Sequence, residues 1–340
     1  MSAPIAHGGG ITAAAAAFGG RPEDWLDLST GINPCPVALP DIPARVWHRL
    51  PDRHLVDAAR RAARDYYGSG EILPLPVPGT QSVIQLLPRL MAGSSVAAMT
   101  DSRVAVVSPT YGEYTRAFAA AGFAVDAVGD IAAIGEEHRL AVVVNPNNPD
   151  GRAWPAKMLI ALHDRMKSQN GLLVVDEAFG DADPALSLAA RAEELSNLVI
   201  FRSFGKFFGL AGLRLGFAIA EGDILDRFEE WLGPWSVSGP ALSLADSLLR
   251  QDVSAIRRRI DERSSGLHGV LTGAGLRIAG GTTLFTVVAD SRASDIYTHL
   301  CRHHILVRKF DYARDWLRFG LAPDPAADRR LGEALQRFER

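Results

Sequence analysis

The sequence predicts an α/β fold in which a large domain, with a mostly parallel sheet flanked by helices, is joined to a smaller α+β domain. Two observations lead to this prediction. Between residues 77 and 220, short apolar runs of strand length alternate with stretches of helical spacing, which is typical of a parallel sheet covered on both faces. After about residue 233 a long helical stretch precedes several strands. A length of 340 residues also exceeds that of a typical single domain.

The composition favours a globular protein with a sizeable core. The apolar fraction is 47%, and the formal net charge of -3 comes from interspersed acidic and basic residues, so we expect neither a nucleic acid nor a membrane as partner. No stretch is apolar for long enough to span a bilayer. Cys35 and Cys301 form neither a disulfide framework nor a zinc pattern, which suits a reducing cytoplasm.

The first fifty residues are rich in glycine and proline, which predicts an N-terminal arm that packs on another part of the chain. Residues 11–18 are expected to form a short helix rather than a signal peptide, because no basic residue precedes them. A second helix is expected from Leu55 to Tyr67, with Gly68 as its C-cap. The predicted domains are the arm at 1–50, packed with the small domain, the large domain at 51–233 and the small domain at 234–340.

The alternating elements follow from the apolar patterns. One helix is expected from Gly79 to about Met91, and another from Ala241 to about Leu271. Further helices are expected at 112–121 and 156–168, with strands at 104–107, 124–128, 141–144, 172–175, 198–201, 215–220, 283–288, 305–309 and 316–321.

Lys206 is the centre of the predicted site. The chain has four lysines, Lys157, Lys167, Lys206 and Lys309, and Lys206 lies in an apolar, glycine-rich segment just after a predicted strand. Open α/β sheets bind ligands beyond the carboxyl ends of their strands. Burial and a neighbouring cation such as Arg214 can deprotonate such a lysine, so that its amine forms a Schiff base with an aldehyde. The alternative is a surface lysine in a loop.

Other segments place polar or aromatic groups at the same edge of the sheet. Gly79-Thr80-Gln81 stands at a helix N-terminus, where N–H groups favour a phosphate, although a plain threonine cap is the alternative. Tyr111 follows a strand, and its ring could stack on a flat ligand or belong to the core. Asp176 ends a buried strand and requires a partner, such as a cation or a backbone N–H.

The spacing of Ser203, Lys206 and Arg214 resembles the signature of pyridoxal-phosphate enzymes of the aspartate aminotransferase fold, the class I/II aminotransferase family. The resemblance implies pyridoxal 5'-phosphate as the cofactor, joined to Lys206 as a Schiff base. It also implies that the cofactor phosphate binds at Ser203, Arg214 and the Gly79-Thr80-Gln81 turn.

The same resemblance assigns the groups around the cofactor ring. Asp176 would pair with the ring nitrogen, and Tyr111 would stack on the ring. Asn148, in a segment similar to the family's N-P-N-N-P-T-G, would bond the phenolic oxygen. Asp150 stands where threonine is usual, and we expect it to act as a turn former. Phe179 stands where aminotransferases of this fold usually carry tyrosine, which argues against an ordinary transaminase.

The N-terminus gives a more specific match. His7-Gly8-Gly9 and the segment from Leu26 to Pro34 resemble the pattern of threonine-phosphate decarboxylases of cobalamin biosynthesis. This implies decarboxylation of L-threonine O-3-phosphate to (R)-1-amino-2-propanol O-2-phosphate by a cytoplasmic homodimer, with Lys206 as proton donor to Cα. The residues expected to hold the substrate phosphate and carboxylate, in an order that the sequence leaves open, are His7, Asn33, Arg308 and Arg318.

Several alternatives remain open at this stage. The chain could instead be an aminotransferase for histidinol phosphate or a similar amine, or a catalytically silent accessory homologue. Arg308 and Arg318 could be surface residues. Leu50 replaces a tyrosine that usually reaches the cofactor phosphate of the neighbouring subunit, so that contact is in doubt. No metal site is expected at His299, Cys301, His303 and His304, because no carboxylate or CxxC partner accompanies them.

Overall fold

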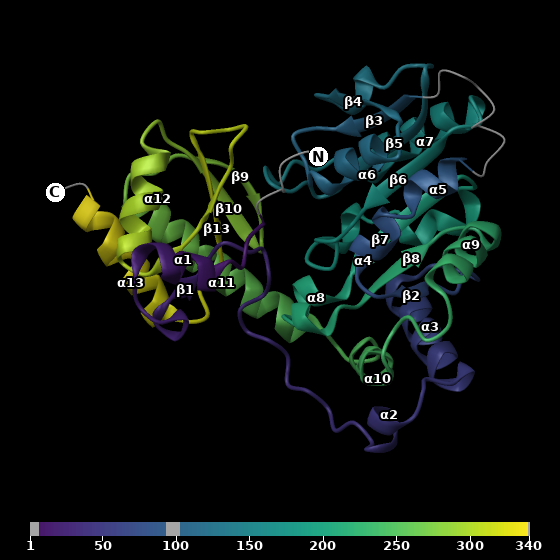
Figure 1. The fold of residues 1–340 in the computed structure, drawn as a ribbon, viewed down its shortest axis with the longest axis horizontal. Coiled ribbons are helices and arrows are strands. Elements are labelled where there is room, and N and C mark those ends of the chain that lie inside the picture. The colour runs from purple at the N-terminus through teal and green to yellow at the C-terminus, as the bar shows by residue number, and fades with distance from the viewer. Residues whose placement is uncertain (1–6, 93–102, 339–340) are drawn as a thin grey trace.

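The computed structural model describes residues 7–92 and 103–338, which form two lobes (Figure 1). The larger lobe contains a seven-stranded sheet in which β8 is antiparallel to both neighbours and the other paired strands are parallel. This arrangement confirms the predicted mostly parallel sheet. In spatial order the strands are β2 (Leu75–Val77), β8 (Gly216–Ile219), β7 (Leu198–Ser203), β6 (Leu172–Asp176), β5 (His138–Val144), β3 (Arg103–Val107) and β4 (Ala124–Val128).

Alternate residues of the central strands enter two separate hydrophobic cores. Val143 and Val175 belong to the core on one face of the sheet, whereas Val142 and Val174 belong to the core on the other. Helices cover both faces, which explains why these strands are continuously apolar. The first face carries α3 (Arg53–Tyr67), α7 (Ala156–Ser168) and α10 (Gly239–Leu248), and the second carries α4 (Thr80–Ile84), α5 (Leu87–Ala92), α6 (Glu113–Ala120) and α9 (Gly222–Leu232).

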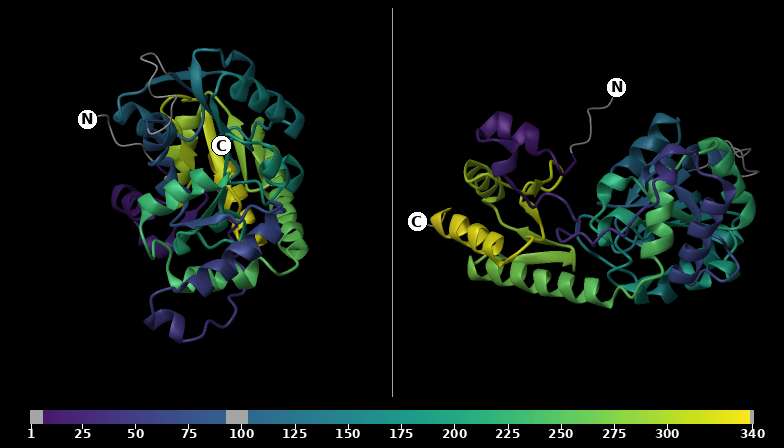
Figure 2. Two further views of the ribbon diagram at one scale, coloured as in Figure 1. Left: turned by 90° about the vertical axis from the view of Figure 1, so that its right-hand side faces the viewer. Right: turned by 90° about the horizontal axis from the view of Figure 1, so that it is seen from below.

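The smaller lobe is built on a four-stranded antiparallel sheet in the order β12-β13-β10-β9. The long green helix in Figure 2, α11, extends from this lobe towards the larger one. The strands are β9 (Ile278–Thr282), β10 (Phe285–Ala289), β12 (Arg308–Lys309) and β13 (Trp316–Gly320), and the helices are α11 (Ser254–Gly273), α12 (Ala293–Arg302) and α13 (Pro325–Phe338).

The N-terminal arm packs on the smaller lobe. Helix α1 (Ile11–Phe18), which agrees with the predicted helix, contacts α12, and β1 (Leu26–Asp27) pairs in parallel with β11 (Ile305–Leu306). The first six residues of the arm lie outside the described part of the chain. The domain boundaries after residues 50 and 233 stay a prediction; α10, which follows the second boundary, packs against α3 of the larger lobe.

Two predicted helices are divided in the structure. The helix expected from Ala241 to Leu271 is broken between α10 and α11, where the Asp252 carboxylate accepts the N–H of Ser254 and starts a new helix. The helix expected from Gly79 to Met91 is divided into α4 and α5, and Pro88 near the start of α5 lacks the N–H that a continuous helix needs.

Other elements differ from the sequence-based prediction in extent. The strand expected at 305–309 is divided at Val307 between β11 and β12, which belong to different sheets. Strand β9 and helices α9, α12 and α13 were not predicted. The remaining short elements are α2 (Arg45–His48), α8 (Phe204–Phe207) and the 3-10 turns Pro22–Asp24, Ile131–Ala133, Pro184–Leu186, Ala189–Glu194 and Ala211–Leu213.

Candidate active site

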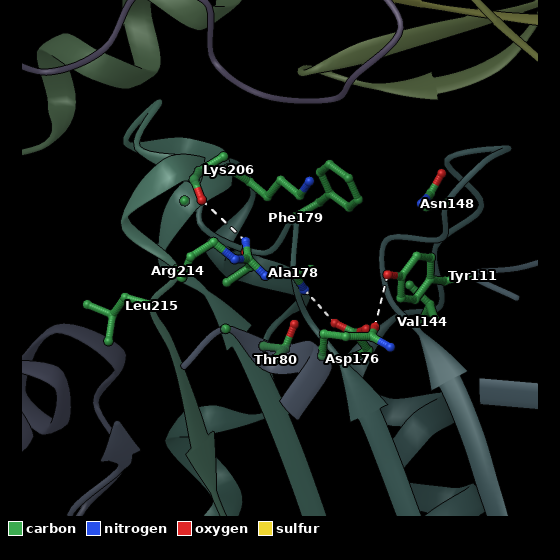
Figure 3. A pocket seen from close by; sticks show the side chains of 15 residues that line it. Thr80, Tyr111, Val144, Asn148, Asp176, Ala178, Phe179, Lys206, Arg214 and Leu215 are labelled. Carbon is green, nitrogen blue, oxygen red and sulfur yellow. Dashed lines mark hydrogen bonds between the residues drawn. The ribbon is translucent and has the colours of Figure 1, made fainter. Parts of the chain in front are cut away.

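A cavity lies at the carboxyl ends of β6 and β7, beside the N-terminus of α4 (Figure 3). The fold brings together here every residue that the sequence assigned to cofactor binding. These residues are Gly79, Thr80, Gln81, Tyr111, Asn148, Asp176, Ser203, Lys206 and Arg214.

Lys206 lies on α8, the short helix that begins directly after β7. Its amine points towards the ring of Phe179 (Figure 3), whose centre is 6.0 Å away. Burial, together with the positive charges of Arg318 and Arg214, lowers the pKa of Lys206 to about 8. A substantial fraction of this amine is therefore neutral near neutral pH, as a nucleophilic lysine requires.

Asp176 ends β6 and is 3% exposed. Its Oδ2 accepts a hydrogen bond from the Tyr114 hydroxyl at 2.7 Å, and its Oδ1 accepts one from the Ala178 N–H at 3.0 Å. Burial raises the pKa of Asp176 to about 6, although both hydrogen bonds oppose that shift. The group is thus a buried anion at neutral pH, suited to a cationic partner in the cavity.

Gly79, Thr80, Ser203 and Arg214 also line the cavity. Gly79 has φ +73°, and a Cβ there would lie 2.8 Å from Nη2 of Arg214. The positive φ favours glycine at this position, and a side chain there would also displace the end of the Arg214 side chain. The N-terminal N–H groups of α4, the Ser203 hydroxyl and the Arg214 guanidinium are the donors that a phosphate group needs.

Tyr111 and Asn148 line the side of the cavity opposite Lys206 (Figure 3). The Tyr111 hydroxyl donates to Oε1 of Gln81 at 3.0 Å, and burial raises the pKa of Tyr111 to about 12. The Oδ1 atom of Asn148 accepts a hydrogen bond from Nη1 of Arg318. Asn148 is therefore a link to the smaller lobe as well as a lining residue.

The turn before Gly151 behaves as predicted. The Asp150 carboxylate accepts hydrogen bonds from Nδ2 of Asn147 at 2.7 Å and from the Arg152 N–H at 3.0 Å. Asp150 therefore stabilises the turn that presents Asn148, which is the role expected for the residue at this position.

A second cavity adjoins the first and shares Lys206, Asn148 and Tyr111 with it. It is also lined by His7, Arg308 and Arg318, three of the four residues predicted to bind substrate. Burial and the nearby Arg308 lower the pKa of Arg318 to about 10, and burial lowers the pKa of Arg308. Two guanidinium groups that share a partly desolvated space favour an anionic ligand.

The structure does not bring Asn33, the fourth predicted substrate residue, to either cavity. Its side chain is buried, with Nδ2 donating to the Phe207 carbonyl at 2.9 Å and Oδ1 accepting the Cys35 N–H at 2.9 Å. Its own N–H donates to the Lys206 carbonyl at 2.9 Å. These bonds fasten the arm to α8, and the predicted contact of Asn33 with substrate stays a prediction.

Comparison of this chain with known proteins identifies its family. The family model described as aminotransferase class I and II matches residues 23–335. The chain belongs to the class I and II aminotransferase family. It is 61% identical over 339 residues to a threonine-phosphate decarboxylase of Sinorhizobium sp, with 100% of both chains covered.

One further relative and one solved structure are also similar to this chain. A threonine-phosphate decarboxylase of Pseudomonas aeruginosa is 42% identical over 339 residues, with 98% of each chain covered. The solved structure of a histidinol-phosphate aminotransferase from Sinorhizobium meliloti, in complex with pyridoxal-5'-phosphate, is similar with a TM-score of 0.81 at 20% identity. The similar region comprises 99% of this chain and 95% of the solved chain. At this identity the shared property is the fold.

Sequence reasoning missed two supporting groups in this aminotransferase-family site. One is Tyr114, which is fully buried and binds Asp176 rather than serving only as a core residue. The other is Arg202, also buried, which donates to Glu177 at 2.6 Å and to Asp181 at 2.7 Å. No signal in the sequence indicated the role of Arg202, because its proximity to Glu177 follows from the strand register, in which Asp176 lies opposite Phe201.

The histidine-rich segment of α12 shows no ligand geometry. The Nε2 atom of His299 is 2.8 Å from the Ala334 carbonyl, and Nδ1 of His303 is 2.9 Å from the His299 carbonyl. Among the described residues, no group of three or more His, Cys, Asp or Glu side chains is arranged to hold a metal ion. In the same part of the chain, no helix is both long and apolar enough to cross a membrane.

Proposed function

We propose that the chain is a pyridoxal-phosphate-dependent decarboxylase that converts L-threonine O-3-phosphate into (R)-1-amino-2-propanol O-2-phosphate and CO2, in cobalamin biosynthesis. The observation that carries this proposal is the 61% identity, over the full length, to a protein named threonine-phosphate decarboxylase. The two adjoining cavities support it, because one suits the cofactor and the other collects cations around a small anionic ligand.

The residues of the first cavity fit pyridoxal 5'-phosphate. Lys206 would bind the aldehyde carbon of the cofactor, and Asp176 would pair with its ring nitrogen. The hydrogen-bond donors around Gly79, Ser203 and Arg214 would bind its phosphate. The space that a Cβ on Gly79 would fill is the space that a phosphate needs next to Arg214. When bound, the cofactor withdraws electrons from the substrate Cα as CO2 leaves.

The protein's own groups supply binding and proton transfer. Arg308 and Arg318 would hold the phosphate and carboxylate of the substrate, and Arg318 presents a planar fork that matches either anion. Loss of CO2 leaves an electron pair at Cα, which must receive one proton. Lys206 is the group in the cavity with a pKa near 8, and it is therefore the proton donor that we assign.

We also propose that the protein is a homodimer in the cytoplasm. Leu39, Trp47, Leu50 and Trp235 are large apolar residues that are each about 60% exposed or more, and the first three lie on the segment around α2. Exposed apolar residues of this size mark interaction surfaces. Both cysteines are free thiols, which is compatible with a reducing compartment.

The test is to mix the purified, cofactor-loaded protein with L-threonine O-3-phosphate and to follow CO2 release with and without 2-oxoglutarate. Release that is independent of the oxoacid supports the decarboxylase. Transfer of an amino group from histidinol phosphate to 2-oxoglutarate, without CO2 release, would replace the proposal with an aminotransferase. Inactivity with both substrates would favour an accessory homologue.

A further inference from the structure

Glu113 is a buried carboxylate on which groups from the N-terminal arm, from α4 and from its own helix α6 converge. It is the first residue of α6 and is 6% exposed. Its Oε2 accepts hydrogen bonds from Nε2 of Gln81 at 3.1 Å and from Nε2 of Gln85 at 3.4 Å. Its Oε1 lies 3.2 Å from Nε2 of His7 and 3.6 Å from Nη1 of Arg116. None of the roles assigned above explains this convergence.

The charge of Glu113 fixes the direction of a chain of hydrogen bonds. An ionised carboxylate accepts hydrogen bonds but cannot donate them, so the amide nitrogen of Gln81 must face Glu113. The amide oxygen of Gln81 then faces Tyr111, whose hydroxyl must donate; Figure 3 marks this bond from Tyr111. A glutamine amide has nearly the same shape in both orientations, so without the carboxylate nothing in this chain would select one of them.

We propose, on the basis of the proposed function, that Glu113 is a positioning residue that keeps the Tyr111 hydroxyl proton directed at Gln81 and holds the Tyr111 ring against the cofactor. The Tyr111 oxygen then offers only lone pairs to groups bound in the cavity. Tyr111 is thereby excluded as the proton donor to Cα, which leaves that role to Lys206.

The same carboxylate holds the N-terminal arm over the substrate cavity. His7 contacts Glu113, and its ring centre is 5.9 Å from that of Tyr111. Behind His7, the Gly9 N–H donates to Oγ of Ser29 at 2.7 Å, and a Cβ on Gly8 would lie 2.4 Å from the Ser29 carbonyl oxygen. The arm is therefore fixed on both sides of Gly8, so that Glu113 also limits the movement of His7.

The experiment is a double-mutant cycle on the full chain, with the dissociation constant of pyridoxal 5'-phosphate for the cofactor-free protein as its readout. Glu113→Gln and Tyr111→Phe should each weaken binding about tenfold, the size expected for one hydrogen bond of a charged network. The double variant should also be about tenfold weaker, because Glu113 acts through the Tyr111 hydroxyl. Arg116→Ala, which removes a partner of Glu113 outside this chain of bonds, should stay within about twofold of the wild type.

An additive result, with the double variant about a hundredfold weaker, would overturn the inference, as would normal binding by Glu113→Gln. If Glu113→Gln does not fold, Gln81→Leu takes its place in the cycle, because it interrupts the same chain of hydrogen bonds between Glu113 and Tyr111. A Gln81→Leu, Tyr111→Phe double variant that binds the cofactor about a hundredfold more weakly than the wild type would then overturn the inference. Failure of the wild-type protein to bind the cofactor would instead refute the proposed function.

Discussion

At the scale of single residues, the site depends on two buried ionisable groups whose pKa values are shifted in opposite directions. Burial lowers the pKa of Lys206 to about 8 and raises the pKa of Asp176 to about 6. Near pH 7 the aspartate is mostly ionised, and the lysine can both give and accept a proton. The two groups therefore provide a fixed negative charge and a movable proton within one cavity.

The first prediction concerns the reactive amine. Lys206→Ala should lower CO2 release by a factor of about 10³ or more, because the chain then lacks both its nucleophile and its proton donor. The measurement is single-turnover CO2 release from the cofactor-loaded variant. Lys157→Ala removes an exposed lysine on α7 and serves as the matched control. Wild-type rates in Lys206→Ala would contradict the assignment.

The second prediction concerns stability and pH in the cofactor-free protein. The pKa of Lys206 in the folded state, about 8, is below its ordinary value of 10.5, so the folded state disfavours the charged amine. This cost is fully present below pH 8 and disappears as the pH rises towards 10.5. Lys206→Met should therefore be more stable than the wild type by roughly 3 kcal/mol at pH 7, and by much less at pH 10. Urea unfolding at both pH values measures this difference; parallel stability curves would contradict the lowered pKa.

At the scale of elements, the site is made of strand ends and the turns that follow them. The turn between β2 and α4 places Gly79 under the Arg214 guanidinium, and the arm segment at Asn33 fastens α8 in position. Each element thus contributes through backbone conformation as much as through side chains. Predictions at this scale concern the geometry of turns and contacts between segments.

The third prediction concerns the β2–α4 turn. In Gly79→Ala the new methyl group meets Arg214, and the residue is strained at φ +73°. Binding of pyridoxal 5'-phosphate should weaken by about tenfold or more, as measured by titration of the cofactor-free protein. Gly269→Ala, in α11 with nothing within 4 Å of the new Cβ, should bind the cofactor normally. Equal affinities would show that this turn tolerates a side chain.

The fourth prediction separates a structural contact from a substrate contact. Asn33→Ala should lower the free energy of unfolding by about 1–3 kcal/mol, since it leaves the buried Phe207 carbonyl without its partner. Its KM for L-threonine O-3-phosphate should stay within about twofold of wild type. Arg318→Lys should instead raise KM about tenfold, because lysine lacks the planar fork. A KM defect in Asn33→Ala would restore its predicted role in substrate binding.

The sequence was sufficient to predict the mostly parallel sheet and to identify the site residues that follow its strands. Lys206 and Asp176 could be found because apolar strands end just before them, and parallel strands end at one edge. Asn33 could not be placed, because its partner Phe207 is distant in sequence and nothing in a turn motif indicates which way an amide points. The break between α10 and α11 depends on one local cap, which competes with a long helical pattern.

At the scale of the whole molecule, the second cavity, which is the proposed substrate cavity, is lined by residues of both lobes. Lys206 and Tyr111 come from the larger lobe, whereas Arg308 and Arg318 come from the smaller one, and His7 comes from the arm. The hydrogen bond between Arg318 and Asn148 joins the lobes directly. The relative position of the lobes therefore determines whether the cations can surround one ligand.

The fifth prediction concerns assembly. Trp47→Glu places a charge on the exposed apolar segment around α2, and it should weaken self-association at least thirtyfold, because a central tryptophan contributes strongly to an interface. Sedimentation velocity over a range of concentrations measures this change. Met158→Glu, on α7, is the control, since Met158 is also exposed but lies on a different helix. A wild-type protein that sediments as a monomer would refute the proposed dimer.

The pairing of β1 with β11 has a consequence for synthesis on the ribosome. Leu26 lies beside Ile305, so the arm leaves the ribosome long before its partner strand exists. At about 5–20 residues per second, the roughly 280 intervening residues take on the order of 15–60 s to translate. During that time the seven-stranded sheet can form behind an undocked arm. The substrate cavity is completed only when the last strands emerge, so a nascent chain cannot bind substrate before its synthesis is nearly finished.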